Sequence, residues 1–180
     1  VAYPLAENEH DRGILSMSVV PARAGLATVE RAQEAAATLG EALDIVGVYC
    51  IEFFCLGDGR VLVNEIAPRP HNSGHGSIDA TSCSQFEQHV RAVCGLPLAT
   101  PRLWRASIVC NILGEGAGNT LEGIEELLAD PAVVLHLYGK GEARMRRKMG
   151  HFTILLDGAP DEAAIARARA ASATLRWSAR

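Results

Sequence analysis

The chain has 180 residues, of which 48% are hydrophobic and 21% are charged. This composition excludes a disordered chain and suits one or two compact domains. The formal net charge of −4 argues against a nucleic-acid binder, and no window approaches the roughly 18 apolar residues that a membrane helix needs. We therefore expect neither a nucleic acid nor a membrane among its partners.

The start of the chain carries no sign of a signal peptide, because charged residues arrive early, at positions 7–12. The first residue is Val1 rather than Met, so we expect a fragment or a processed piece. The five cysteines are odd in number and form no C-x-x-C motif. Because most of them lie in apolar runs, we expect buried, reduced thiols and regard a zinc site as the weaker interpretation.

Hydrophobic patterns predict the first elements of the chain. Residues 1–5 and 12–20 have the composition of short strands. Residues 27–43 repeat apolar residues at helical spacing, and Thr28 is suited to cap that helix. We therefore expect two strands and a helix before the first distinctive motif.

The next two strands, at residues 46–56 and 60–66, enclose Asp58-Gly59, a pair typical of a two-residue hairpin turn. Counting outward from that turn places Glu52 directly opposite Glu65, with Cβ atoms about 4.5–5.5 Å apart. Two carboxylates between apolar neighbours repel each other unless they share a proton or bind a cation. Mg²⁺, which prefers oxygen ligands and nucleotide phosphates, is the natural occupant.

This hairpin is open to a second interpretation. Both glutamates could simply face water at a solvated end of the strands, which is the better interpretation for an arbitrary hairpin. In a regular ladder Asn64 points to the opposite face, and it reaches the glutamate side only if a bulge re-aims it.

A loop rich in Pro, Gly, Ser and Asn is expected at residues 67–83. Arg69 offers a planar fork for a carboxylate, phosphate or bicarbonate, and Asn72 adds neutral donors. His71 could donate a hydrogen bond or carry a proton near neutral pH. His71 and His75 have the spacing of a helical metal pair, but the Pro and Gly residues around them disfavour a helix. The alternative is a polar surface loop without a ligand.

After this loop, Ser84 and Glu87 resemble a capping box that opens a helix ending near Cys94. The Pro and Gly residues at 95–101 mark the best domain boundary. We therefore expect one domain at residues 1–98 and a second, smaller domain at residues 99–180.

The second part mixes strands with helices. The predicted strands cover residues 106–112, 133–138 and 149–156. The predicted helices cover residues 121–129 and 161–176. Strands and helices that alternate without a fixed repeat indicate an α+β fold.

Five cations lie within nine residues of the second part: Lys140, Arg144, Arg146, Arg147 and Lys148. Such a cluster suits a substrate that carries a phosphate. Taken alone, a solvated basic turn or a minor nucleic-acid patch is the better interpretation.

Several blocks of this sequence resemble one enzyme family. The blocks are YPLAENEHDRGIL at 3–15, VGVYCIEFF at 46–54, NEIAPRPHNSGH at 64–75, SQFEQHVRAVCGLPL at 84–98 and LHLYGKGEARMRRKMGH at 135–151. In order and content they are similar to the N5-carboxyaminoimidazole ribonucleotide synthetases, the ATP-grasp ATPase subunits of phosphoribosylaminoimidazole carboxylase. The resemblance spans roughly residues 1–156.

The resemblance implies an α+β fold, with the carboxy-terminal lobe of an ATP-grasp domain followed by a small β-rich carboxy-terminal domain. It also implies an ATP-dependent carbon–nitrogen ligase of purine biosynthesis. That enzyme carboxylates 5-aminoimidazole ribonucleotide with bicarbonate through carboxyphosphate, and it forms ADP and phosphate. The implied cofactors are ATP and Mg²⁺, and the implied state is a cytoplasmic homodimer.

The resemblance also implies roles for individual residues at the nucleotide. Glu52 and Glu65 match the family's Mg²⁺ ligands. His10 and the pair Asn64-Glu65 match its nucleotide contacts.

Five further residues match the substrate pockets of the family. Arg69, His71 and Asn72 match the pocket that holds bicarbonate or carboxyphosphate and carries the catalysis. Lys140 and Arg147 match the contacts to the phosphate of the ribonucleotide.

The sequence departs from the family at three points. Met145-Arg146 replaces the usual Pro-Gly, and Gly76-Ser77 replaces an aromatic residue and Thr. The family's amino-terminal domain and ATP lid have no counterpart in this sequence, so we expect the isolated chain to be inactive. Another ATP-grasp ligase, such as a formate-dependent glycinamide ribonucleotide transformylase or biotin carboxylase, and a non-catalytic binding or assembly module are the alternatives.

Overall fold

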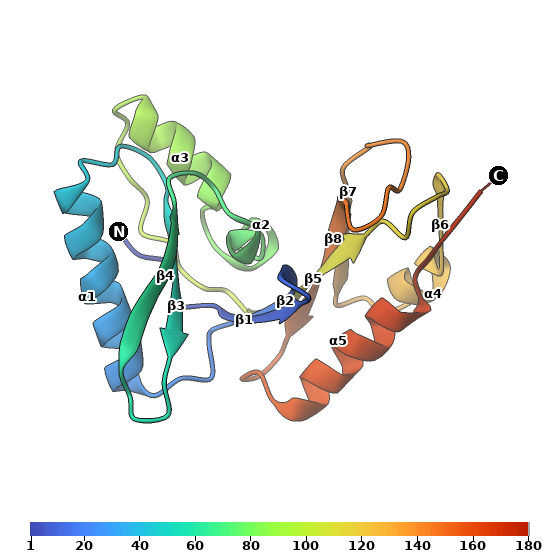
Figure 1. Ribbon diagram of the computed structural model, residues 1–180, viewed down its shortest axis with the longest axis horizontal. Helices are drawn as coiled ribbons and strands as arrows, with labels where there is room; N and C mark the ends of the chain where they lie inside the picture. Colours follow the sequence, from blue (N-terminus) through green and yellow to red (C-terminus); the bar gives the residue numbers. More distant parts are fainter. Residues whose placement is uncertain (180) are drawn as a thin grey trace.

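The computed structural model describes residues 1–179 and combines helices with antiparallel sheet (Figure 1). The amino-terminal part contains β1 Glu7–Asp11, β2 Ile14–Val20, α1 Leu26–Ala42, β3 Cys50–Cys55, β4 Val61–Ala67, the 3₁₀ helix η1 Asn72–Gly74, α2 Ser77–Ala80 and α3 Gln85–Val93. The carboxy-terminal part contains β5 Ala106–Leu113, β6 Thr120–Glu122, α4 Ile124–Leu128, β7 Val133–Leu137, β8 Lys148–Leu156, α5 Glu162–Thr174 and β9 Arg176–Ser178. The predicted α+β class is confirmed.

The largest sheet has five antiparallel strands in the order β1-β2-β5-β8-β7. Strand β2 comes from the amino-terminal part and pairs with β5, with Val19 opposite Ile108. The sheet therefore crosses the boundary expected near residue 98. The division into residues 1–98 and 99–180 stays a prediction.

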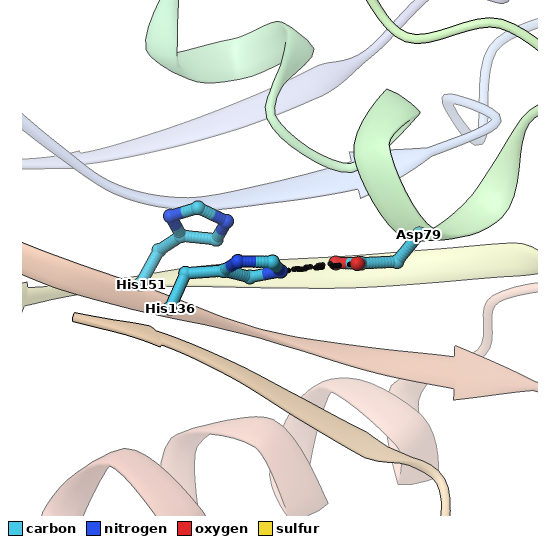
Figure 2. Close-up of side chains that lie close together, drawn as sticks. All are labelled: Asp79, His136 and His151. Carbon is cyan, nitrogen blue, oxygen red and sulfur yellow. Dashed lines mark hydrogen bonds and ion pairs between the residues drawn. The ribbon is translucent and has the colours of Figure 1, made fainter. Parts of the chain in front are cut away.

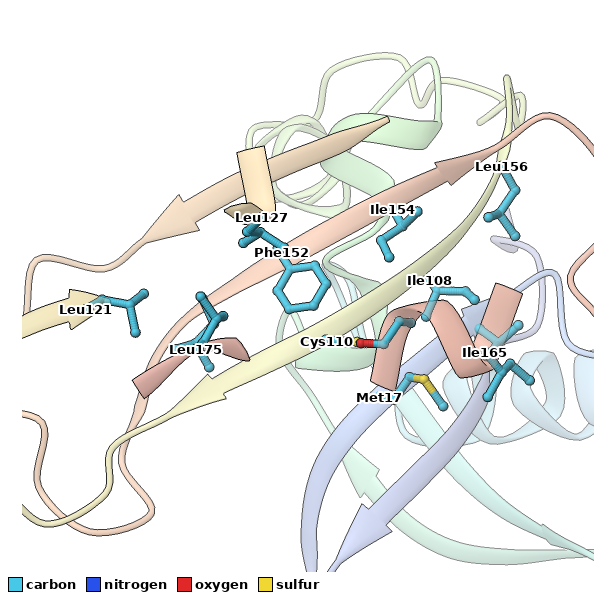
Figure 3. Packing of buried hydrophobic residues seen from close by; sticks show 13 residues of the cluster. Met17, Ile108, Cys110, Leu121, Leu127, Phe152, Ile154, Leu156, Ile165 and Leu175 are labelled. Atoms are coloured by element: carbon cyan, nitrogen blue, oxygen red, sulfur yellow. The ribbon is translucent and has the colours of Figure 1, made fainter. Parts of the chain in front are cut away.

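One face of this sheet carries the hydrophobic core. Ile108 and Cys110 of β5 point to this face, as do Phe152 and Ile154 of β8, and all four pack toward α5 (Figure 3). Helix α5 contributes Ile165 and Ala168 to the same cluster. Successive side chains of a strand point to opposite faces, so this pattern leaves the second face to other residues.

The second face of the sheet is mostly polar and still buried, with Val109 among its polar residues. It carries side chains that are at most 8% exposed: Ser18, Ser107, Asn111, His151 and Thr153. The segment of η1 and α2 covers part of this face, where Thr153 Oγ1 donates to Asp79 Oδ2 at 2.7 Å. Buried polar side chains need partners, so this face can hold the covering segment in one position.

The hairpin β3–β4 forms a separate two-stranded sheet, with α1 beside it (Figure 1). The buried apolar cluster draws none of its described members from α1, β3 or β4. The hairpin leaves apolar side chains exposed, including Phe54, Leu62 and Val63. This part of the chain is therefore packed more lightly than the five-stranded sheet.

Three predictions about the bounds of elements are wrong. Residues 1–5 are not a strand, because the edge of β2 is taken by β1. Thr28 does not cap α1, which begins at Leu26 after the extended Gly25. The helix expected at 121–129 begins at Ile124, because Leu121 pairs with Trp177 in β6–β9, a pair of strands too short to leave a periodic signal.

The register of the hairpin differs from the prediction near the turn and agrees with it at the glutamates. The turn is longer than two residues, so Cys55 faces Val61. The register shifts between Glu52 and Phe53, where Asn64 is the extra residue of a bulge in β4. The two differences cancel, and the predicted pairing of Glu52 with Glu65 is confirmed.

The predicted start of α3 is also confirmed. Ser84 Oγ accepts a hydrogen bond from the Glu87 backbone N–H at 3.2 Å, and the helix begins at Gln85. The Glu87 carboxylate pairs with Arg91 four residues later. Capping of this kind stabilises a helix by about 1 kcal/mol.

All five cysteines are free thiols. Cys83 and Cys110 are buried as expected, and Cys50 is half-buried. Cys55 and Cys94 are exposed, so the expectation of burial is wrong for these two. Among residues 1–179, no helix combines the length and the apolar character needed to cross a membrane.

Candidate functional site

The carboxylates of Glu52 and Glu65 form the centre of the site. They lie on neighbouring strands, and each can place one oxygen within 4.8 Å of the other and of a His71 ring nitrogen. The Glu52 side chain is only 13% exposed, and its Oε1 lies 3.9 Å from His71 Nε2 and 4.0 Å from His10 Nε2. Two carboxylates this close fit Mg²⁺, whose preferred ligands are carboxylate oxygens.

His71 is buried, and its neighbours fix which ring nitrogen carries hydrogen. The Ser73 backbone N–H donates to His71 Nδ1 at 3.4 Å, and Ser73 Oγ lies 2.9 Å from the same nitrogen. Nδ1 is therefore an acceptor, and the hydrogen of the neutral ring sits on Nε2. Burial lowers the pKa of His71, against the opposing effect of Glu52. The ring thus presents a neutral Nε2–H donor toward the carboxylates.

The other expected residues of the anion loop lie close by in the chain. Arg69 is exposed and donates from Nη1 to the Pro70 carbonyl at 3.0 Å. Asn72 opens η1, directly after His71. Asn64 is exposed at the bulge. Their expected roles stay predictions.

The basic turn between β7 and β8 is held by its own side chains. Lys140 Nζ donates to the Lys148 carbonyl at 2.7 Å and lies 5.1 Å from the centre of the Tyr138 ring. Arg147 Nη1 donates to the Lys140 carbonyl at 3.3 Å. Lys140 and Arg147 are both exposed, so their expected roles toward a phosphate stay predictions.

Lys148 links this turn to the carboxylate pair. Partial burial and then the charge of Arg69 lower the pKa of Lys148, while the charge of Glu52 acts in the opposite direction. Lys140 also lowers the pKa of Lys148. The charges of the anion loop, the basic turn and Glu52 therefore all affect Lys148. In the sequence Lys148 is one of the five cations of this turn, but only Lys140 and Arg147 match a role in the family.

A second cluster lies on the polar face of the large sheet, where Asp79, His136 and His151 come together (Figure 2). His136 Nε2 lies 3.0 Å and 3.1 Å from the two Asp79 oxygens. The rings of His136 and His151 are stacked with centroids 4.6 Å apart. Lone pairs lie in the planes of these rings, so stacked rings do not aim them at one ion. The geometry favours a hydrogen-bonded Asp–His pair over a metal site.

His75 and His151 extend this cluster toward His71. Their ring centroids lie 4.8 Å apart, and Tyr138 Oη lies 2.9 Å from His151 Nδ1. Burial lowers the pKa of His75 to about 4 and that of His151 to about 3, with further lowering by neighbouring cationic groups. Both rings are therefore neutral at pH 7.

The residues that support the histidines of the site through hydrogen bonds, Gln85 and Asp79, were not predicted from the sequence. Gln85 and Asp79 bond to partners that lie 14 and 57 positions away in the chain. A single sequence carries no local signal for such pairs. A Gln at the first turn of a helix and an Asp after a Gly-rich loop both look like ordinary surface residues.

The structure shows the surroundings of the residues that depart from the family pattern. Arg146 adopts a φ of 62°, which favours glycine. Gly76 packs against β5, where a Cβ would lie 3.0 Å from a Val109 methyl group. Ser77 keeps a hydroxyl that donates to the Gly74 carbonyl at 2.6 Å.

Two family models match the chain. The ATP-grasp domain matches residues 1–86, and the phosphoribosylaminoimidazole carboxylase C-terminal domain matches residues 107–166. Together they cover both ends of the five-stranded sheet. The expected ATP-grasp lobe followed by a smaller carboxy-terminal region is confirmed as a fold class.

Two curated relatives carry the same name. The N5-carboxyaminoimidazole ribonucleotide synthase of Brucella melitensis is 49% identical over 151 residues, which are 84% of this chain and 41% of the relative. That of Bacillus subtilis is 45% identical over 153 residues, which are 85% of this chain and 40% of the relative. The chain thus spans about two fifths of the length of these relatives.

Solved structures agree with the sequence relatives. The synthetase from Thermotoga maritima is 43% identical, with a TM-score of 0.86 over 91% of this chain and 46% of that one. The Aspergillus clavatus enzyme in complex with ADP and 5-aminoimidazole ribonucleotide is 35% identical, with a TM-score of 0.87 over 95% of this chain and 47% of that one. The chain therefore belongs to the N5-carboxyaminoimidazole ribonucleotide synthase family.

Proposed function

We propose that this chain supplies the metal and bicarbonate side of an ATP-dependent ligase that carboxylates 5-aminoimidazole ribonucleotide. The reaction consumes ATP and bicarbonate and yields N5-carboxyaminoimidazole ribonucleotide, ADP and phosphate in purine biosynthesis. The observation that carries this proposal is the pairing of Glu52 with Glu65 beside the Nε2–H of buried His71.

The chemistry begins with bicarbonate, which is a poor electrophile until ATP phosphorylates it to carboxyphosphate. Phosphoryl transfer depends on positioning and on neutralising charge more than on covalent help from the protein. Glu52 and Glu65 would hold Mg²⁺, which neutralises the phosphate oxygens when bound. Lys148 supplies a further cation, whose charge interacts with that of Glu52.

Bicarbonate needs donors that match a planar anion. The Arg69 guanidinium provides a planar fork, and His71 provides one neutral donor. The 3.9 Å between His71 Nε2 and Glu52 Oε1 is too long for a direct hydrogen bond, so this donor is free for a bound anion. Because Ser73 occupies Nδ1, His71 cannot turn its acceptor side to the anion without losing two contacts.

The ribonucleotide phosphate would meet the basic turn. Lys140 and Arg147 are exposed, and both are tied to backbone carbonyls of the same turn. A turn held in one shape presents its charges with a smaller entropic cost on binding. The complex of the Aspergillus clavatus relative with ADP and 5-aminoimidazole ribonucleotide supports this choice of substrate.

The test is a chimaera in which this chain replaces the matching segment of the Brucella melitensis relative. We expect release of ADP that depends on both bicarbonate and 5-aminoimidazole ribonucleotide. Replacing Glu65 by Gln in the chimaera should lower kcat by at least about 100-fold, on the scale of a lost electrostatic contact at the transferring phosphoryl group. Turnover with glycinamide ribonucleotide or biotin instead would favour the other ATP-grasp ligases.

Several finer expectations are also proposals. The isolated chain should show no turnover, because its relatives are more than twice as long. Binding of Mg²⁺ and formation of a homodimer are two further expectations. Calorimetry with Mg-ADP can measure the binding, and sedimentation can measure the oligomeric state. Absence of any Mg-nucleotide binding by the chimaera would favour a non-catalytic module. The cytoplasmic location stays a prediction.

A further inference from the structure

Helix α3 turns its amides inward and part of its apolar surface outward. Gln85 and Gln88 are 3% and 5% exposed, whereas Phe86, Val90 and Val93 are 42–54% exposed. A buried amide without partners costs about 1–3 kcal/mol, so these two glutamines must be satisfied inside the protein. The bonds that satisfy them reveal what they do.

Each glutamine side chain binds both the backbone N–H and the backbone carbonyl of one loop residue, an arrangement that we call a clamp. Gln85 Oε1 accepts from the His71 N–H at 2.9 Å, and Gln85 Nε2 donates to the His71 carbonyl at 2.7 Å. Gln88 Oε1 accepts from the Ala99 N–H at 3.1 Å, and Gln88 Nε2 donates to the Ala99 carbonyl at 2.8 Å. The two clamps are alike, but only the first holds a residue of the site.

Gln85 makes a third bond, which fixes the state of His75. Because the His71 N–H can only donate, the Gln85 atom facing it must be oxygen, and the other atom is the amide nitrogen. That nitrogen lies 3.0 Å from His75 Nδ1 and can only donate to it. His75 is therefore held with its hydrogen on Nε2, as His71 is.

The surrounding backbone is shaped to admit this amide. A Cβ on Gly74 would lie 2.7 Å from Gln85 Oε1 and 2.9 Å from Gln85 Cδ, closer than real contacts allow. The Gln85 backbone N–H donates to Ser77 Oγ at 2.9 Å, which anchors the first turn of α3 on the same loop. Glycine at 74 thus leaves the space that the clamp occupies.

We propose that Gln85 is a positioning residue that sets the place of His71 and the tautomer of His75. It does not touch the proposed substrates and acts through the two histidines. The clamp itself rests on geometry alone, whereas its effect on turnover rests on the proposed function. The two can therefore be tested separately.

The first test measures tautomers in the ¹⁵N-labelled chain at pH 7, by two-bond ¹H–¹⁵N correlation of the histidine rings. The unsubstituted chain should show His71 and His75 with hydrogen on Nε2. Gln85→Met removes all three bonds at nearly constant volume, and His75 should become a mixture of both tautomers. Gln88→Met removes an equivalent clamp from the same helix and should leave both rings unchanged.

Two results of this experiment would overturn the proposal. One is a His75 ring that is unchanged in Gln85→Met, and the other is an equal change in Gln88→Met. If Gln85→Met does not fold, Gln85→Glu decides the question, because a carboxylate keeps the acceptor for the His71 N–H but cannot donate. His75 should then carry its hydrogen on Nδ1, and an unchanged tautomer would refute the clamp.

The second test measures kinetics in the chimaera with the Brucella melitensis relative. Gln85→Met should lower kcat about 10- to 100-fold with little change in the KM for ATP, as expected for a misplaced catalytic donor. Gln88→Met should keep kcat. Equal kcat in both variants would refute the positioning role. An inactive parent chimaera would count against the proposed function, and the ring tautomers would still decide the role of Gln85.

Discussion

At the residue scale, Arg146 occupies a backbone conformation that costs stability. Its φ of 62° lies in the left-handed region, which costs a residue with a Cβ about 1–2 kcal/mol. The family usually has glycine at this position. Arg146→Gly should therefore raise the free energy of unfolding by about 1 kcal/mol, even though the hydrogen bond from its guanidinium to the Arg12 carbonyl is lost.

Urea denaturation of the isolated chain can measure this change. Arg144→Gly is the matched control, because Arg144 is an exposed arginine of the same turn without a positive φ. The control should lose a few tenths of a kcal/mol to about 1 kcal/mol through added backbone entropy. A loss of similar size in Arg146→Gly would contradict the argument from φ.

His75 and His151 make the protein sensitive to acid. Both have an ordinary pKa of 6.5, which burial lowers to about 4 and about 3 in the folded chain. Between pH 6.5 and pH 4 the unfolded chain binds more protons than the folded chain, so stability falls as the pH falls. The slope is about 1.4 kcal/mol per pH unit for each histidine that stays neutral.

This slope can be checked by urea denaturation between pH 6.5 and pH 5, above the range in which most carboxylates titrate. In His75→Gln the free energy of unfolding should depend less steeply on pH, because about one proton fewer is taken up on unfolding. The slope should fall by roughly 1.4 kcal/mol per pH unit. An unchanged slope would mean that His75 titrates normally in the folded chain.

At the scale of elements, the two opposed carboxylates lower the stability of the hairpin β3–β4. Glu52 and Glu65 oppose each other, and directly opposed like charges destabilise a pair of strands by roughly 0.2–1 kcal/mol. Glu65→Gln should therefore raise the melting temperature in buffer that contains a chelator. Mg²⁺ should raise the melting temperature of the unsubstituted chain and leave the variant nearly unchanged.

Glu34→Gln is the control for this prediction, because Glu34 is an exposed glutamate on α1 without an ion pair in residues 1–179. It should change neither the melting temperature in chelator nor the response to Mg²⁺. A higher melting temperature for this control would point to net charge rather than to the opposed pair.

The same hairpin shows how far the sequence could predict the site. The predicted pairing of Glu52 with Glu65 holds because the longer turn and the bulge at Asn64 offset each other, although neither feature was expected from the sequence. The clamp from Gln85 and the pair of Asp79 with His136 were not predictable, because each joins segments that lie far apart in the sequence. Strands β6 and β9 are three residues each, too short to predict from periodicity.

At the scale of the whole molecule, packing is uneven. The apolar cluster lies between the five-stranded sheet, α4 and α5, whereas α1, β3 and β4 contribute none of its described members. Regions with few buried apolar contacts open more easily than the core. We therefore expect backbone amides of β5 and β8 to exchange hydrogen most slowly, and those of β3 and β4 much faster.

Hydrogen exchange followed by mass spectrometry can test this order. Mg-ADP should slow exchange in the peptide that covers residues 50–67 and leave the peptide that covers β5 unchanged. Uniform protection of both regions would show that the hairpin unfolds only with the core.

The two faces of β8 have a consequence for mutational tolerance. Phe152 and Ile154 point to the core, while His151 and Thr153 point to the segment that carries the site. A saturation scan along this strand should show an effect with a period of two residues. Substitutions at even positions should reduce the amount of folded protein most, whereas small substitutions at odd positions should chiefly loosen the segment of η1 and α2 that covers this face.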